Sequence, residues 1–301
     1  MDEATPGGST DVFQRAGWKL KLPDTPMVLD DAKLLQYRFP AELPMLALAL
    51  AAIAILIAGF LYREPEIAIG ILGVYLSMLF SAAQAKTYYR MQGAEVTPTQ
   101  FSEIFTIFEE LRLRFQAPPT RIFVLRKMSF RADALGLKAP YVIVLPAILI
   151  DGLESDELRY VLGQALGHIC FGHTRIAVLM GGEESALPAL LSWVAWVRDL
   201  IFAGYWRAAA ISSDRAGILA CKSVGKAIRA QIKLSVGTNQ LQQVRTEDLV
   251  EQAFKVSQGI TRFQAMLIRW RSPVPPLIPR LEKMIAWAGL PTRHEPRPDI
   301  D

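Results

Sequence analysis

Two long apolar stretches dominate the pattern of hydrophobic and polar positions near the start of the chain. Residues 44–62 and residues 67–85 contain no charged side chain, and each stretch has 19 residues, close to the roughly 20 that a helix needs to cross the hydrocarbon core of a bilayer. Only a short charged connection, residues 63–66, separates them. The pattern predicts a tight hairpin of two transmembrane helices over residues 42–88, after a polar segment over residues 1–41. A buried hairpin in a soluble protein is the alternative.

The positive residues around these stretches predict their orientation. Lys33 and Arg38 precede the first stretch and Lys86 and Arg90 follow the second, whereas the connection holds only Arg63. Because positive residues concentrate on the cytoplasmic side of membrane proteins, both ends of the hairpin and the large C-terminal part are expected to face the cytoplasm.

From Thr97 onward the pattern is that of a globular domain, predicted over residues 97–289. Apolar residues at helical spacing predict an amphipathic helix with one core face, made of Phe101, Ile104, Phe105, Phe108 and Leu111. Short runs rich in β-branched residues predict strands at 121–126 and 141–146. Further helices are predicted at 156–172, 246–270 and 277–288, with Gly289 ending the last, and residues 290–301 form a tail. The expected fold class is α+β, mostly helical with a small sheet.

A third apolar region, Leu187–Trp206, is interrupted by the charged pair Arg198 and Asp199. A charged pair at the centre of a bilayer is costly. We therefore favour a hairpin that is buried or lies at the membrane surface over true insertion.

Composition supports a membrane protein and argues against nucleic-acid binding. Hydrophobic residues make up 51% of the chain and the net charge is only +4. No dense cluster of Lys and Arg with interleaved aromatic residues is found, so no nucleic-acid partner is expected. The two cysteines, Cys170 and Cys221, are expected to be reduced, buried thiols, and a disulfide between them is the alternative.

The segment Val161–Thr174, VLGQALGHICFGHT, has the form of a zinc-binding helix without its zinc chemistry. An active helix of this kind reads H-E-x-x-H, in which two His on one face hold Zn²⁺ and the Glu is the general base. In this chain the corresponding positions hold Gln164, Ala165 and His168. One ligand is replaced by an amide and the base by a methyl group.

Several separated motifs resemble the HtpX-type membrane zinc metallopeptidases, a gluzincin family that includes the CAAX prenyl proteases. The first is the zinc helix, which keeps Leu166, Gly167, His168, Ile169, Gly172 and His173. The second is residues 207–217, where the family has its third zinc ligand four residues before an A-D-R-A-G motif, here matched by Asp214, Arg215, Ala216 and Gly217. Residues 131–136 fall where the family has a substrate-binding edge strand, and residues 274–281 resemble a late His-Pro-Pro-Leu segment followed by an Arg.

This resemblance implies a zincin-like metallopeptidase domain after the transmembrane hairpin, with edge-strand binding residues Arg131, Ala132, Asp133 and Ala134 and a late Arg280. The departures fall on the chemistry: the first ligand is Gln164, the base Ala165, the third ligand Ala210 and the late His Val274. The family's cofactor, zinc, is therefore not expected, and the chain is expected not to be an active enzyme.

The residues alone support the loss of zinc, because a catalytic zinc site needs three protein ligands. His173 is five residues beyond His168, about 140° around a continuous helix, so the two rings are not expected to converge on one ion. His168 is expected to be hydrogen-bonded in an enclosed polar pocket, with Asp214 as its partner. His173 is expected to interact with the last carbonyls of its helix, and Arg280 either to pair with Asp214 or to lie at the cleft.

Three functions remain open. The favoured one is a membrane-anchored pseudopeptidase that binds a protein or peptide as a scaffold or regulator. The alternatives are an active metalloendopeptidase with an unusual metal site and a structural subunit assembled with other membrane proteins. The resemblance implies the inner membrane of a bacterium, with the chain crossing it more than once.

Overall fold

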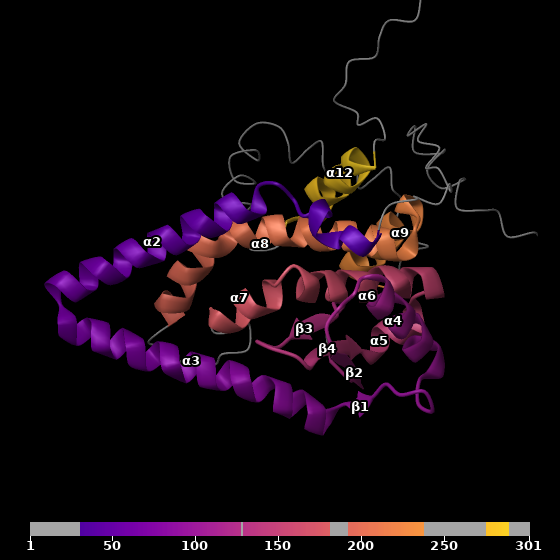
Figure 1. The fold of residues 1–301 in the computed structure, drawn as a ribbon, viewed down its shortest axis with the longest axis horizontal. Coiled ribbons are helices and arrows are strands. Elements are labelled where there is room, and N and C mark those ends of the chain that lie inside the picture. The colour runs from indigo at the N-terminus through magenta and orange to yellow at the C-terminus, as the bar shows by residue number, and fades with distance from the viewer. Residues whose placement is uncertain (1–30, 128, 181–191, 238–274, 289–301) are drawn as a thin grey trace, which may run out of the picture.

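The structure is a computed structural model that describes residues 31–127, 129–180, 192–237 and 275–288 (Figure 1). The fold is α+β, mostly helical with a small mixed sheet, as the sequence predicts. The predicted helix over 246–270, Gly289, the tail over 290–301, Val274 and the first 30 residues lie outside the described residues.

The sheet contains four strands in the order β1-β2-β4-β3. The central strands β2 (Thr120–Leu125) and β4 (Tyr141–Pro146) are parallel, and they confirm the two strands that the sequence predicts. The short strands β1 (Ala94–Glu95) and β3 (Asp133–Leu135) pair antiparallel with β2 and β4. β3 thus ends the sheet at the position where an edge strand is expected.

Both faces of the sheet are covered. All six residues of β4 are buried. Because side chains alternate along a strand, Ile143 and Leu145 belong to the main core, whereas Val142 and Val144 pack with Tyr89 of α3 on the opposite face. The main core lies between the sheet and the helices α4 (Ser102–Arg114), α6 (Ser155–Cys170), α8 (Ser192–Cys221), α9 (Val224–Val236) and α12 (Leu277–Trp287). A short helix, α5 (Ala147–Gly152), follows β4.

Helices α6 and α8 run antiparallel in close contact. A Cβ atom added at Gly163 would lie 2.3 Å from Cβ of Ala220, and one added at Gly167 would lie 2.6 Å from Cβ of Ala216. Increasing numbers on α6 therefore meet decreasing numbers on α8. This close approach explains Gly163 and Gly167 of the zinc-helix motif.

The predicted hairpin over Leu187–Trp206 is wrong for the residues that the structure describes. From Ser192 onward this region is part of the continuous helix α8. The guanidinium of Arg198 binds Asp199 at 2.7 Å and the carbonyl oxygen of Met180 at 2.7 Å. Both charges are satisfied on the helix surface, so the pair does not interrupt the helix.

The two helices of the predicted transmembrane hairpin are present but do not pack as a tight pair. A single residue, Glu64, separates α2 (Glu42–Arg63) from α3 (Pro65–Gln92). From this shared end the two helices diverge, α2 along α8 and α3 toward α7 (His173–Leu179) and the sheet (Figure 1). A short 3-10 helix, η1 (Asp31–Tyr37), leads into α2 and contacts α8.

By length and composition, α2 is the one helix among the described residues that is suited to cross a membrane. Its side chains in the apolar stretch are largely exposed, including Leu48 and Ile55. The second span, in α3, stays a prediction.

Candidate functional site

The aligned faces of α6 and α8 bring the resemblance motifs together. Gln164 of α6 donates a hydrogen bond from Nε2 to Oδ1 of Asp214 on α8, at 2.6 Å. Because the helices are antiparallel, one turn further along α6 and one turn back along α8 reach His168 and Ala210. The four positions therefore follow one stretch of the α6–α8 contact.

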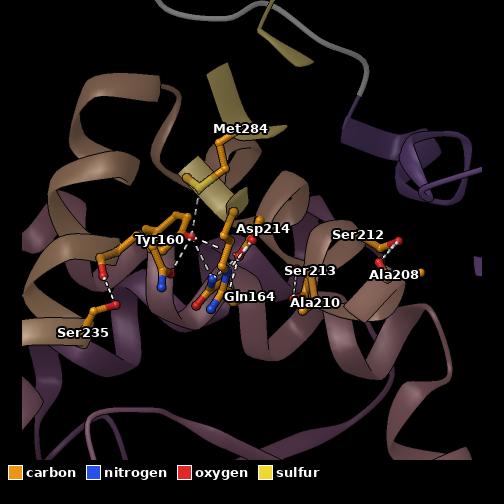
Figure 2. Close-up of polar contacts among 11 residues, drawn as sticks. Tyr160, Gln164, Ala208, Ala210, Ser212, Ser213, Asp214, Ser235 and Met284 are labelled. Atoms are coloured by element: carbon orange, nitrogen blue, oxygen red, sulfur yellow. Dashed lines mark hydrogen bonds and ion pairs between the residues drawn. The ribbon is translucent and has the colours of Figure 1, made fainter. Parts of the chain in front are cut away.

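Asp214 is the centre of a buried polar network (Figure 2). Its carboxylate accepts two hydrogen bonds from Arg280 of α12, at 2.5 and 2.6 Å. The hydroxyl of Tyr160 lies 3.1 Å from Asp214 Oδ1 and 3.1 Å from Gln231 Oε1, and it accepts a hydrogen bond from Gln164 Nε2 at 2.8 Å. Of the two alternatives for Arg280, the structure supports the pair with Asp214.

The charges in this network fix its protonation. Burial alone would lower the pKa of Arg280, but the ion pair with Asp214 outweighs burial and raises it. Burial and the neighbouring Asp214 raise the pKa of Tyr160 well above its usual value. Tyr160 therefore keeps its proton, and its hydroxyl serves as a hydrogen-bonding group within the network.

The expected contact between His168 and Asp214 is wrong, since Gln164, Tyr160 and Arg280 supply the partners that are described for Asp214. The partner of His168 is His173: their Nδ1 atoms are 2.9 Å apart, and the rings meet edge to face. His168 is only partly buried, so it is not fully enclosed.

The expected separation of the two rings, and the expected contact of His173 with the last carbonyls of its helix, are also wrong. The continuous helix ends at Cys170, and Gly172 adopts a φ of 82°, in the left-handed region that favours glycine. His173 then begins α7 in a new direction. The 140° separation assumed one continuous helix, which Gly172 interrupts.

Glu42, the first residue of α2, lies next to His173 and extends the His168–His173 pair to three side chains. Its Oε1 lies 2.9 Å from Nε2 of His173 and 3.3 Å from a guanidinium nitrogen of Arg38, and its Oε2 accepts a short hydrogen bond from Ser212. Glu42 is 0% exposed and His173 is 1% exposed. A line of three side chains, Glu42–His173–His168, thus leads from the apolar helix α2 to the α6–α8 contact.

Sequence reasoning did not find Glu42. It is 131 residues from His173, and no local spacing connects the two. The available signal was weaker: the carboxylate of Glu42 stands directly before an uncharged run of 20 residues, 43–62, and such a charge needs a partner when the helix is buried or embedded.

The donor atoms present do not fit zinc. Gln164 offers zinc only a neutral amide oxygen, which is not among the usual zinc ligands, and Ala165 packs in the main core. Ala210 offers no ligand atom. Within the described ranges, no group of three or more His, Cys, Asp and Glu side chains is arranged to hold a metal ion.

The edge strand lies beside this region. β3 contacts both α6 and α7. Asp133 is bound by Lys127 at 2.9 Å and by Arg131 at 3.3 Å, while Ala132 and Ala134 pack against the main core. The proposed binding residues of the strand therefore have one side held by the domain, and β3 has no strand beyond it in the described part of the sheet.

Comparison with protein-family models and with curated proteins finds no match to this chain.

Proposed function

We propose that the protein is a membrane-anchored pseudopeptidase with a zincin-like domain of the HtpX type, which binds a polypeptide or partner protein and does not cut it. One observation carries the proposal: the close antiparallel pair α6 and α8 aligns Gln164, His168, Ala210 and Asp214. These are the positions that hold the metal and its supporting carboxylate in the family that the sequence resembles.

The hydrogen-bond partners of His168, the surviving ligand position, support the same proposal. A metal-binding His usually passes its other ring N–H to a carboxylate or carbonyl, which fixes the ring. His168 keeps such support through His173 and Glu42. The support for a ligand is therefore present, whereas the other ligands are replaced by Gln164 and Ala210.

Polypeptide binding without catalysis is supported by the edge strand. Adding a strand to a sheet edge uses backbone N–H and C=O groups and needs no metal. β3 lies against α6, so an added strand would run beside the aligned positions. A scaffold, an adaptor or a regulator of an active relative would use such a surface.

Photo-crosslinking tests this proposal. Phe130, next to β3, and Phe101, at the start of α4, are 38% and 39% exposed, so benzoylphenylalanine at each position gives a matched pair. Unfolded casein is expected to crosslink at position 130 and not at position 101, and to remain uncut. Equal crosslinking at both positions, or none, contradicts binding at the edge strand.

Zinc analysis tests the loss of catalysis. The purified chain, exposed to zinc and then dialysed, is expected to retain far less than one zinc per chain, because His168 is the one intact ligand position among those aligned. Stoichiometric zinc that a chelator removes, together with casein cleavage that is lost on His168→Ala, would support the active metallopeptidase instead.

The exposed apolar surface of α2 favours a second candidate, a structural subunit of a membrane complex. Leu48 and Ile55 are 65% and 72% exposed. Crosslinks to other membrane proteins that map to α2 and to the start of α8, with none at position 130, would favour this function.

A further inference from the structure

The three side chains Glu42, His173 and His168 form a directed hydrogen-bond chain. Each ring nitrogen of His173 has a partner, Glu42 Oε1 on one side and His168 Nδ1 on the other, both at 2.9 Å. His173 is fully enclosed, whereas His168 is partly exposed. The chain therefore runs from a buried carboxylate to a partly exposed ring on α6, the helix that β3 contacts.

The direction of the hydrogen bonds follows from Glu42. Arg38, Ser212 and His173 surround its carboxylate with donors. A carboxylate has no proton to give, so Nε2 of His173 carries the proton and donates a hydrogen bond to Oε1 of Glu42. In a neutral imidazole the other nitrogen is then an acceptor.

The same argument passes to the next ring. Nδ1 of His173 accepts, so Nδ1 of His168 donates, and Nε2 of His168 is left with its lone pair. Neutral rings are consistent with the surroundings: burial lowers the pKa of His173, although Glu42 opposes it. Burial, His173, Arg131 and Arg280 together lower the pKa of His168 well below its usual value.

The charges around His168 limit what its Nε2 can bind. Arg131, beside the edge strand, and Arg280, on α12, both act on His168 as positive charges. Although Asp133 and Asp214 partly offset these charges, an ammonium or guanidinium group would still be repelled by them. A neutral donor, such as a backbone N–H or a hydroxyl group, would not.

We propose that Nε2 of His168 is a fixed hydrogen-bond acceptor that recognises a neutral N–H or O–H group of a polypeptide bound along β3, and that Glu42 fixes it through His173. Glu42 is a positioning residue: it does not touch the polypeptide. The identity of the ligand rests on the proposed function, whereas the state of His168 does not.

The full chain has only three His, so selective ¹⁵N-histidine labelling in detergent micelles gives few signals. For His168 we expect a protonated Nδ1 and an unprotonated Nε2. In Glu42→Gln the amide can donate a hydrogen bond as well as accept one, so it no longer fixes the proton of His173 on Nε2. The ratio of the two tautomers of His168 should then shift by roughly tenfold, as expected for the loss of one charge-assisted hydrogen bond. Glu66→Gln, an exposed residue of α3, is the matched control and should leave the spectrum unchanged.

Unfolded casein serves as the polypeptide probe. Its addition should move the Nε2 signal of His168 toward that of a hydrogen-bonded nitrogen in the wild-type chain, and less so in Glu42→Gln. A wild-type His168 that is protonated at Nε2 overturns the inference without any variant. Casein that crosslinks at position 130 but leaves the Nε2 signal unmoved also overturns it, and leaves the proposed function standing. A failure to crosslink removes the proposed function and, with it, the ligand assigned here.

Discussion

Asp214 is the buried carboxylate of the site that pairs with Arg280. It is 1% exposed and faces Arg280, Gln164 and Tyr160. From the sequence, Asp214 was predicted to orient a polar neighbour, and His168 was the expected one. His168 instead contacts His173, because the chain turns at Gly172. That turn depends on the backbone angle of Gly172, which the spacing of the histidines does not reveal.

Replacing Asp214 with Ala should therefore lower the free energy of unfolding by about 3–5 kcal/mol, since the Arg280 charge would be left buried without its partner. Asp151→Ala, at an exposed position, should change it by less than about 0.5 kcal/mol. Chemical denaturation of the two variants in the same detergent measures the difference. Similar values for both would show that the Asp214 network contributes little.

The two linked His make folding dependent on pH. Burial lowers the pKa of both His168 and His173 from the usual 6.5. As the pH falls through 6.5, the two His take up protons in the unfolded chain but not in the folded chain. Their contribution to the free energy of unfolding is therefore full above pH 6.5 and is lost progressively below it. We expect a slope of up to about 1.4 kcal/mol per pH unit for each His.

Denaturation at a series of pH values from about 7.5 to about 5.5 measures this slope. His168→Gln should reduce it, because one of the two rings whose pKa is lowered is removed. A slope that the substitution leaves unchanged would mean that His168 takes up its proton as readily in the folded chain as in the unfolded one.

At the scale of elements, local patterns predicted the two central strands and the helices α2, α3, α4, α6 and α12, but not the other described elements or how the helices meet. β2 and β4 are runs of β-branched residues bounded by turn signals, and α12 has strong helical periodicity, so neighbouring residues suffice to define them. The continuity of α8 was missed because Arg198 is satisfied by Met180 and Asp199. The divergence of α2 from α3 was missed because α2 packs on α8, far away in the sequence.

Replacing Gly with Ala is expected to have opposite effects on stability at two positions, Gly59 in α2 and Gly163 at the close approach of α6 and α8. Ala is a better helix former than Gly by about 1 kcal/mol, so Gly59→Ala in α2, with no atom within 4 Å of the added Cβ, should be neutral or stabilising. Gly163→Ala would place its Cβ 2.3 Å from that of Ala220 and should destabilise by about 1–3 kcal/mol. Thermal or chemical unfolding compares the pair, and a stabilising Gly163→Ala would mean that the helices can separate at no cost.

At the scale of the whole molecule, the apolar helix α2 and the candidate site are one structure. Glu42 begins α2 and ends the hydrogen-bond chain to His168, while the apolar face of α2 that follows is exposed. An exposed apolar surface of this length needs a bilayer or a protein to cover it. Membrane attachment through α2 would therefore hold Glu42 in place beneath the site.

Ile55, near the middle of α2 and 72% exposed, tests this attachment. A Lys at the centre of a spanning helix costs roughly 3 kcal/mol, so Ile55→Lys should lower the fraction of the chain that stays with membranes after an alkaline wash. Leu113→Lys makes a comparable change at a 66% exposed position on α4, away from the apolar helices, and should not. Equal retention of both variants would contradict a membrane role for α2.

The same wash decides how many times the chain crosses the membrane. Leu72 is 55% exposed on α3, within the second apolar stretch that the sequence predicts to span. If both helices cross, Leu72→Lys should reduce retention about as much as Ile55→Lys, because each Lys would lie in hydrocarbon. If α3 stays outside the bilayer, its Lys remains in water and retention should match that of Leu113→Lys. The second result would mean that α2 attaches to the membrane without crossing it, because α3 returns from the far end of α2 to the same domain that holds Glu42.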